Sequence, residues 1–279
     1  MQDFGWQAMF YIGALPALLA LGLRVLLPES PRWLASRGRM AEADVAMKHI
    51  EDAVERATRA PLPTPTSVPP APVKSASLSD LFGQRYLRRT LVLWTIWFCA
   101  YYINYGLTVW LPTLYTGVLH VPLSQALSYS LYGTIIGFCG SFACALLIDI
   151  VGRKVWITIS FLLGTFVLGG LWFHGVTSPE FLFATAALLQ LTTSSICLAV
   201  YVYTPESYPT RARAIAVSTS TAWLRLASII GPIAVGQLVP AFGLNSIFLM
   251  FAGVAFIGFA VVAGFAEETK NRVLEEVSP

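Results

Sequence analysis

The apolar residues of this chain are gathered into long runs separated by short polar segments. A helix that crosses about 30 Å of hydrocarbon needs about 20 such residues in succession. No charged residue lies between Arg89 and Asp149, and Pro112 and Pro122 bound a turn within that interval. The pattern predicts seven spans, at about 7–27, 90–115, 126–148, 155–173, 180–204, 214–239 and 246–266. We therefore expect an all-α membrane protein.

The segment between the first and second spans has a different pattern. From Gly38 to Thr58, apolar residues recur at helical spacing among charges, which predicts an amphipathic helix. Prolines crowd the interval 61–72 and predict an extended linker. The predicted organisation is the first span with the end that follows it at 1–34, the amphipathic helix and linker at 35–88, and a six-helix bundle at 89–279.

Basic residues divide the connecting segments into two groups. Nearly all of them lie on one side of the predicted spans, in 28–89, in the loops at 153–154 and 211–213, and in the tail after 266. The opposite side has no Lys or Arg in the start, 116–125, 174–179 or 240–245. The positive-inside rule then places the N-terminus outside and the C-terminus in the cytoplasm. The membrane would be the plasma membrane, or the inner membrane if the source is bacterial.

Composition agrees with this interpretation. The chain is 56% hydrophobic and 12% charged, too apolar for a soluble domain. Its net charge of +3 is accounted for by basic loops, so it does not indicate nucleic-acid binding. The cysteines lie inside apolar runs without metal-ligand spacing, so free thiols and no metal or cofactor are expected, at Cys99, Cys139, Cys144 and Cys197.

Three motifs lie at span ends on the basic side. They are Pro-Glu-Ser-Pro-Arg-Trp-Leu at 28–34, Asp-Ile-Val-Gly-Arg-Lys at 149–154 and Glu-Ser-Tyr-Pro-Thr-Arg-Ala-Arg-Ala at 206–214. In this order and spacing, they resemble the motifs of sugar-porter-like and organic-acid transporters of the major facilitator superfamily. The tail at 268–276 resembles the ending P-E-T-K-G-x-x-L-E-E, with Glu267 in place of proline and Asn271 in place of glycine. The chain maps to helices six to twelve of a twelve-helix fold.

The resemblance implies a fold in which the substrate lies between two six-helix halves that alternate access. Six of the seven spans would form the C-terminal half-bundle, and helices one to five are missing from this chain. It is therefore either a fragment or in need of a partner half, and we expect no transport by it alone. The resemblance also implies an inner gate, with plain topology anchoring as the alternative, at Glu29, Arg32, Asp149, Gly152, Arg153, Lys154, Glu206, Arg211 and Arg213.

One strong charge lies deep within a predicted span. Arg225 is 12 residues beyond Arg213, hence about 18 Å along the helix and near the bilayer centre. A guanidinium there costs about 3 kcal/mol on insertion scales, so it should face a cavity or a partner. Ser218, Thr221 and Ser228 share its helix face. Its planar fork suits a substrate carboxylate; a structural arginine neutralised by the missing half is the alternative. Organic-acid symporters, which the chain resembles, have an arginine at this place.

The span at 90–115 has an aromatic and polar face. Its members recur at helical spacing, at Trp97, Tyr101, Asn104, Tyr105 and Thr108. Their mid-span depth favours cavity lining over anchoring at the lipid interface. The run resembles the seventh helix of organic-acid symporters and lacks the Q-Q-x-S-G-x-N string of sugar-transporting members. A small anionic carboxylate is therefore the expected substrate, with a neutral sugar or other metabolite as the alternative.

Two further sets of residues have more than one interpretation. Gln190, Ser194, Cys197 and Tyr201 could complete the cavity wall or form hydrogen bonds between helices. Glycines at 133, 137 and 140 favour close helix contact, and Gly231-Pro232 favours a permitted kink.

Other functional classes fit less well. The sequence offers no phosphate loop, metal cluster or nucleophile beside a base, so an enzyme is not expected. A seven-helix receptor shares the predicted topology, but the segment of about 60 residues after the first span is unusual for one. No acidic side chain lies in the interior of a predicted span, so proton coupling, if present, would use the missing half. The substrate, the coupling ion, the true start and the oligomeric state stay open.

Overall fold

The computed structural model describes residues 7–26, 29–62, 77–209 and 211–270. Two compact units divide the chain, one at 1–71 and one at 72–279. All regular secondary structure in the described residues is helical, which confirms the predicted fold class. The membrane-length helices begin and end within a few residues of the predicted spans.

The first unit contains three helices. α1 (Gln7–Leu26) is apolar along its length, and α3 (Met40–Thr58) is the predicted amphipathic helix. Between them lies α2 (Pro31–Ser36), a short helix with proline at its first position, where the missing N–H costs nothing. Among the described side chains of this unit, Leu34 of α2 and Ala43 of α3 are the buried apolar ones.

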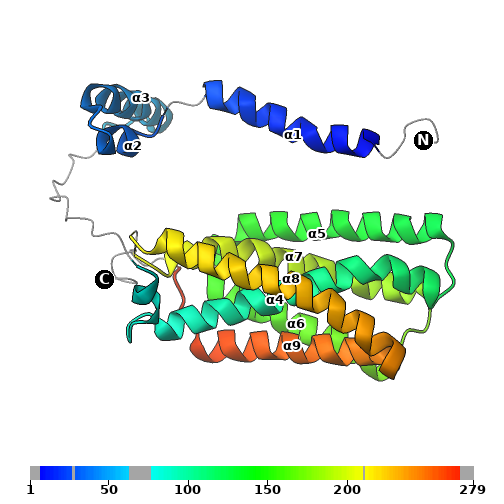
Figure 1. Ribbon diagram of the computed structural model, residues 1–279. Helices are drawn as coiled ribbons and strands as arrows, with labels where there is room; N and C mark the ends of the chain where they lie inside the picture. The colour runs from blue at the N-terminus through cyan, green and yellow to red at the C-terminus, as the bar shows by residue number, and fades with distance from the viewer. Residues whose placement is uncertain (1–6, 27–28, 63–76, 210, 271–279) are drawn as a thin grey trace. The chain divides into compact units, whose positions relative to one another are not determined.

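The second unit is a bundle of six long helices, which Figure 1 shows side by side. A short 3-10 helix, η1 (Leu78–Phe82), precedes them. The six helices are α4 (Leu87–Gly117), α5 (Leu123–Val151), α6 (Arg153–His174), α7 (Pro179–Glu206), α8 (Arg213–Phe242) and α9 (Leu244–Phe265).

Helices α4 and α7 form the centre of the bundle. α4 packs against α8 and α9, and α7 packs in the same way against α5 and α6. The two central helices also pack against each other, and α6 packs against α9. The bundle therefore consists of two successive three-helix sets, α4–α6 and α7–α9. The first helix of each set packs against the second and third helices of the other set.

Five described helices, α5 to α9, are long and apolar enough to cross a membrane, and α1 holds a shorter apolar stretch, Met9–Arg24. α4 is 31 residues long but contains Trp, Tyr and Asn residues that lower its hydropathy below that of the five. Its central position gives the reason: many of its side chains are covered by other helices rather than by lipid.

Helices α5 and α7 approach each other closely along a row of glycines. A Cβ atom at Gly140 would lie 2.2 Å from the backbone oxygen of Leu191, too close for any side chain. Ser141 donates a hydrogen bond to the backbone oxygen of Ser194 at 3.1 Å in the same contact. The glycines thus act in helix packing, as the sequence pattern favoured.

Candidate functional site

A cluster of charges joins three helices at one end of the bundle, which we term the charged end. Arg153, at the start of α6, forms a two-pronged pair with Glu206 at the end of α7, with N···O distances of 3.0 and 2.8 Å. The same guanidinium lies 2.6 Å from Asp149 at the end of α5. The side chains of Arg153 and Glu206 are 12% and 23% exposed, whereas that of Asp149 is 72% exposed. The Arg153–Glu206 pair is therefore the protected part of the cluster.

The N-terminus of α6 is capped by a carboxylate from a segment distant in the sequence. Glu268 accepts hydrogen bonds from the backbone N–H groups of Arg153 and Lys154, at 2.9 and 3.1 Å. A carboxylate here satisfies free N–H groups and interacts favourably with the helix dipole. Gly152 makes the approach possible, because its φ is +101° and a Cβ atom there would lie 2.6 Å from the Glu268 carboxylate.

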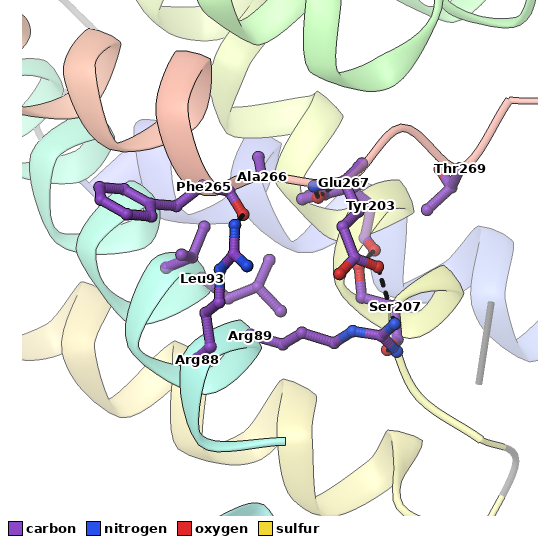
Figure 2. A pocket seen from close by; sticks show the side chains of 10 residues that line it. Arg88, Arg89, Leu93, Tyr203, Ser207, Phe265, Ala266, Glu267 and Thr269 are labelled. Atoms are coloured by element: carbon purple, nitrogen blue, oxygen red, sulfur yellow. Dashed lines mark hydrogen bonds and ion pairs between the residues drawn. The ribbon is translucent and has the colours of Figure 1, made fainter. Parts of the chain in front are cut away.

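The segment after α9 also contacts the other helices at this end. Thr269 donates to Glu206 at 2.6 Å, and the Lys270 ammonium donates to the carbonyl of Ile150 at 2.5 Å, at the end of α5. Figure 2 shows Glu267 facing Arg89 of α4, and the two are 2.7 Å apart. Residues 267–270, which we term the tail strap, thereby connect α4, α5, α6 and α7.

Tyrosines complete this end of the bundle. The hydroxyl of Tyr203 donates to the backbone oxygen of Glu267 at 2.7 Å and accepts from its N–H at 3.1 Å. Tyr208, between α7 and α8, is buried and shares a 2.8 Å hydrogen bond with Thr90. Burial raises the pKa of the Tyr208 phenol, so it stays a neutral hydrogen-bonding group at physiological pH.

The structure brings together five of the residues predicted for the gate: Asp149, Gly152, Arg153, Lys154 and Glu206. Arg213 instead donates to the backbone oxygen of Tyr208 at 3.1 Å, and Arg211 is exposed. Glu29 belongs to the other unit, and the side chain of Arg32 lies outside the described residues.

Sequence reasoning left the tail strap and Arg89 out of the predicted gate. The only signal for the strap was the resemblance of the tail to a family ending, and periodicity says nothing about irregular segments. Arg89 marked a span boundary in the sequence, where a basic residue is expected on topological grounds alone.

The polar stripe on α8 is present as predicted and lies on an open side of the bundle. Arg225 is exposed and Thr221 half-exposed, and Arg225 has no ion-pair or side-chain hydrogen-bond partner among the described residues. Trp223, two residues earlier and so on the opposite side of the helix, packs against Trp94 and Phe98 of α4. The guanidinium therefore points away from the α4 contact, at mid-helix depth.

The aromatic face of α4 is divided between the interior and the surface. Trp97 is fully buried and donates to the Thr204 hydroxyl at 2.8 Å. It therefore does not line a cavity, contrary to what the sequence had led us to expect. Tyr101 is also buried, stacks on Trp97 and donates to the backbone oxygen of Cys197 at 3.4 Å. Asn104 and Tyr105 are only partly buried. Thr108 is exposed, so these three are the members of this face that have open surface next to them.

Gln190 connects the two central helices. It is 8% exposed and donates to the Thr108 hydroxyl of α4 at 3.3 Å. A hollow beside it, between α4, α5 and α7, is lined by residues that include Thr108, Tyr129 and Phe183. Gln190 thus forms a hydrogen bond between helices, one of the two uses left open for it, and also borders this hollow.

Comparisons with known proteins agree with this architecture. A family model described as "Sugar (and other) transporter" matches residues 1–279. The "Niacin transporter NiaP" of Acinetobacter baylyi is 30% identical over 275 residues, which are 98% of this chain and 61% of that protein. The "Putative niacin/nicotinamide transporter NiaP" of Bacillus subtilis is 31% identical over 277 residues, 98% of this chain and 60% of that protein. The chain thus spans about three fifths of the length of these relatives.

The fold is similar to that of a solved transporter. The major facilitator proton:xylose symporter XylE, bound to 6-bromo-6-deoxy-D-glucose, superposes with a TM-score of 0.71 at 21% identity. The match covers 98% of this chain and 58% of that one. At this identity, the likeness concerns the arrangement of helices and not the ligand.

Proposed function

Because the chain belongs to the sugar and other transporter family of the major facilitator superfamily, we propose that it is the C-terminal portion of a secondary transporter for a small organic carboxylate. The family is one of multi-pass membrane transporters and not of enzymes. In this proposal, residues 1–34 supply the last helix of the N-terminal half and 89–279 supply the C-terminal half. Helices one to five come from a preceding segment or a partner.

One observation carries the substrate class. Arg225 places a permanent positive charge midway along an apolar helix without a carboxylate partner among the described residues. An unpaired guanidinium is costly at that depth, so it needs an anion from the substrate or from the other half. Its planar donors fit a carboxylate through two parallel hydrogen bonds.

The rest of the substrate would be recognised by nearby polar and aromatic groups. Thr221 lies one turn from Arg225 on the same helix, and Tyr105 and Asn104 supply an aromatic ring and an amide from α4. Tyr101 and Gln190, which are buried, would hold this wall in position through their bonds to α7 and α4. An aromatic carboxylate such as niacin, which both relatives' names carry, has matching chemistry; the name of the second relative also carries nicotinamide.

The charged end would be the cytoplasmic gate. In the proposed cycle, the Arg153 cluster closes against the N-terminal half in one state and opens in the other. Proton symport is the proposed driving force. Because no acidic side chain lies in the interior of α4–α9 as described, the coupling carboxylate would belong to the N-terminal half.

The test uses two ligands with the same ring that carry a carboxylate or a neutral amide. Nicotinate and nicotinamide share the same ring, but only nicotinate has a carboxylate. We expect the assembled transporter, with its N-terminal half, to prefer nicotinate by about tenfold or more. Arg225→Lys keeps the charge but loses the fork, so part of the preference should remain, whereas Arg225→Gln should abolish it.

Isothermal titration calorimetry on variants with unchanged unfolding temperature measures the preference. Equal binding of both ligands by wild-type protein would remove the carboxylate proposal. A preference that survives in Arg225→Gln would instead remove Arg225 from the site and leave the substrate class intact.

A further inference from the structure

An apolar groove runs along the outside of the bundle between α8 and α9, with α4 as its floor. Its volume is about 240 Å³, and it is lined by Leu91, Trp94, Thr95, Phe98, Cys99, Trp223, Val254 and Ile257. The one hydroxyl among them, on Thr95, is already used in a 2.8 Å hydrogen bond to the backbone oxygen of Leu91. Apart from the indole N–H groups of Trp94 and Trp223 and the thiol of Cys99, the groove is apolar.

Aromatic rings form much of its wall. The Trp94 and Trp223 rings lie 5.3 Å apart, and the Phe98 ring meets Trp223 edge to face at 6.1 Å. Phe82 of η1 packs on Trp94 at 5.6 Å at the end nearest the charged end. From Leu91 to Cys99 the floor extends for about 12 Å along α4, which is long enough for much of an acyl chain.

A cation lies about one helical turn beyond the groove along α4, in a neighbouring small pocket. Arg88 precedes Leu91 by three residues and Thr95 by seven, and therefore lies on the same face of α4. Its guanidinium lies 5.6 Å from the centre of the Phe265 ring and donates to the backbone oxygen of Phe265 at 3.5 Å. Figure 2 shows Arg88 directed to Phe265 and its neighbour Arg89 directed to Glu267.

Arg88 and its neighbour Arg89 differ in their partners. Arg89 pairs with Glu267 at 2.7 Å, while no carboxylate pairs with Arg88 among the described residues. The arrangement is thus an apolar groove with a nearby cation that has no carboxylate partner among the described residues. This charge pattern is complementary to a phospholipid with a negative headgroup.

We propose that this groove binds one anionic phospholipid of the leaflet at the charged end, with an acyl chain along α4 and the phosphate at Arg88. The site is separate from the proposed substrate site, because Trp223 and Arg225 point to opposite sides of α8. Its lining is mostly apolar and offers a small carboxylate no charged partner. The lipid would hold α8, the helix that carries Arg225, against α9.

Photolabelling of the intact chain in vesicles tests the proposal. The probe is phosphatidylglycerol with a diazirine in its acyl chain, and phosphatidylcholine with the same chain is the zwitterionic comparison. We expect labels on α4 and α9 at groove residues. Phosphatidylglycerol should label about fivefold more strongly, and Arg88→Gln should remove that preference.

A matched pair of variants distinguishes the groove from the general lipid-facing surface. Ile257→Trp fills the groove, whereas Ile159→Trp makes the same change on α6 at similar exposure, 52% against 55%. The first should reduce labelling of α4 about fivefold and the second should not change it. Should Ile257→Trp lower the unfolding temperature, Val254→Phe replaces it.

Two results would overturn the proposal. One is labelling spread evenly over all outward faces, with no difference between the two tryptophan variants. The other is an undiminished preference for phosphatidylglycerol in Arg88→Gln. Neither result would bear on Arg225, so the lipid site and the substrate site are tested independently.

Discussion

Burial separates the two carboxylates that pair with Arg153. Glu206 is largely covered and accepts two hydrogen bonds from the guanidinium, whereas Asp149 is mostly in contact with solvent. Partly buried, two-pronged pairs lose much when one partner is removed, because the other charge is left without compensation. Exposed pairs contribute little.

Glu206→Gln should therefore destabilise the bundle more than Asp149→Asn. We expect a loss of about 2–3 kcal/mol for the first change and less than about 1 kcal/mol for the second. Denaturation in mild detergent, followed by tryptophan fluorescence, measures both. Equal losses for the two variants would contradict the assignment of Glu206 as the main partner.

Asp149 is expected to act on the conformational balance instead. Asp149→Asn should change the ratio of inward- to outward-open states of the assembled transporter more than its substrate affinity, since the residue lies far from α8's midpoint. Accessibility of single cysteines at both ends reports the ratio. Equal loss of substrate affinity in both states would count against a gating role.

Some features of individual residues could be predicted from the sequence and others could not. The isolated charge of Arg225 was visible because insertion of a guanidinium into hydrocarbon is costly wherever it occurs. Trp97 was expected to line a cavity with Tyr105, but it is buried against Thr204 of α7. Helical periodicity gives the direction of a side chain around its own helix, and it does not say which neighbouring helix covers that direction.

At the scale of elements, close packing of α5 on α7 depends on Gly140. Gly140→Ala would force a Cβ atom into the Leu191 carbonyl, so the helices must separate, and we expect a loss of about 2 kcal/mol or more. Gly169→Ala on α6 is the matched control, since nothing lies within 4 Å of its added Cβ atom. Thermal unfolding of the two variants decides the matter, and indistinguishable curves would refute the close contact.

The tail strap should stabilise the first turn of α6 at the charged end. Glu268→Gln retains the shape of the side chain but removes the charge at the start of α6, and we expect a cost of about 1 kcal/mol. Hydrogen exchange of the first turn of α6 should become faster, while exchange at the far end of α6 stays the same. Unchanged exchange of that first turn would show that Glu268 does not hold the helix start.

The long helices could be predicted from the sequence, whereas the contacts of the tail strap could not, and the difference has a physical reason. Runs of apolar residues define the long helices almost completely, because lipid allows only a helix with satisfied backbone groups or a closed barrel. The contacts of residues 267–270 involve four helices distant in sequence. Such contacts depend on the packed bundle and leave no local pattern.

For the whole molecule, the distribution of basic loops predicts that the charged end is cytoplasmic. A single cysteine placed at Arg211, which is exposed, should react with an impermeant maleimide only after the membrane is opened. A cysteine at His174, at the opposite end of α6, should react from outside without permeabilisation. The reverse pattern would invert the topology and the proposed position of the gate.

The central claim, that this chain is the carboxylate-binding portion of a transporter, is tested most directly by vesicle counterflow of labelled nicotinate. Vesicles holding the chain joined to an N-terminal half should exchange the label, and the same vesicles with Arg225→Gln should not, at equal protein content. The chain alone should also give no exchange. Exchange that continues undiminished in Arg225→Gln, or that needs no second half, would contradict the account.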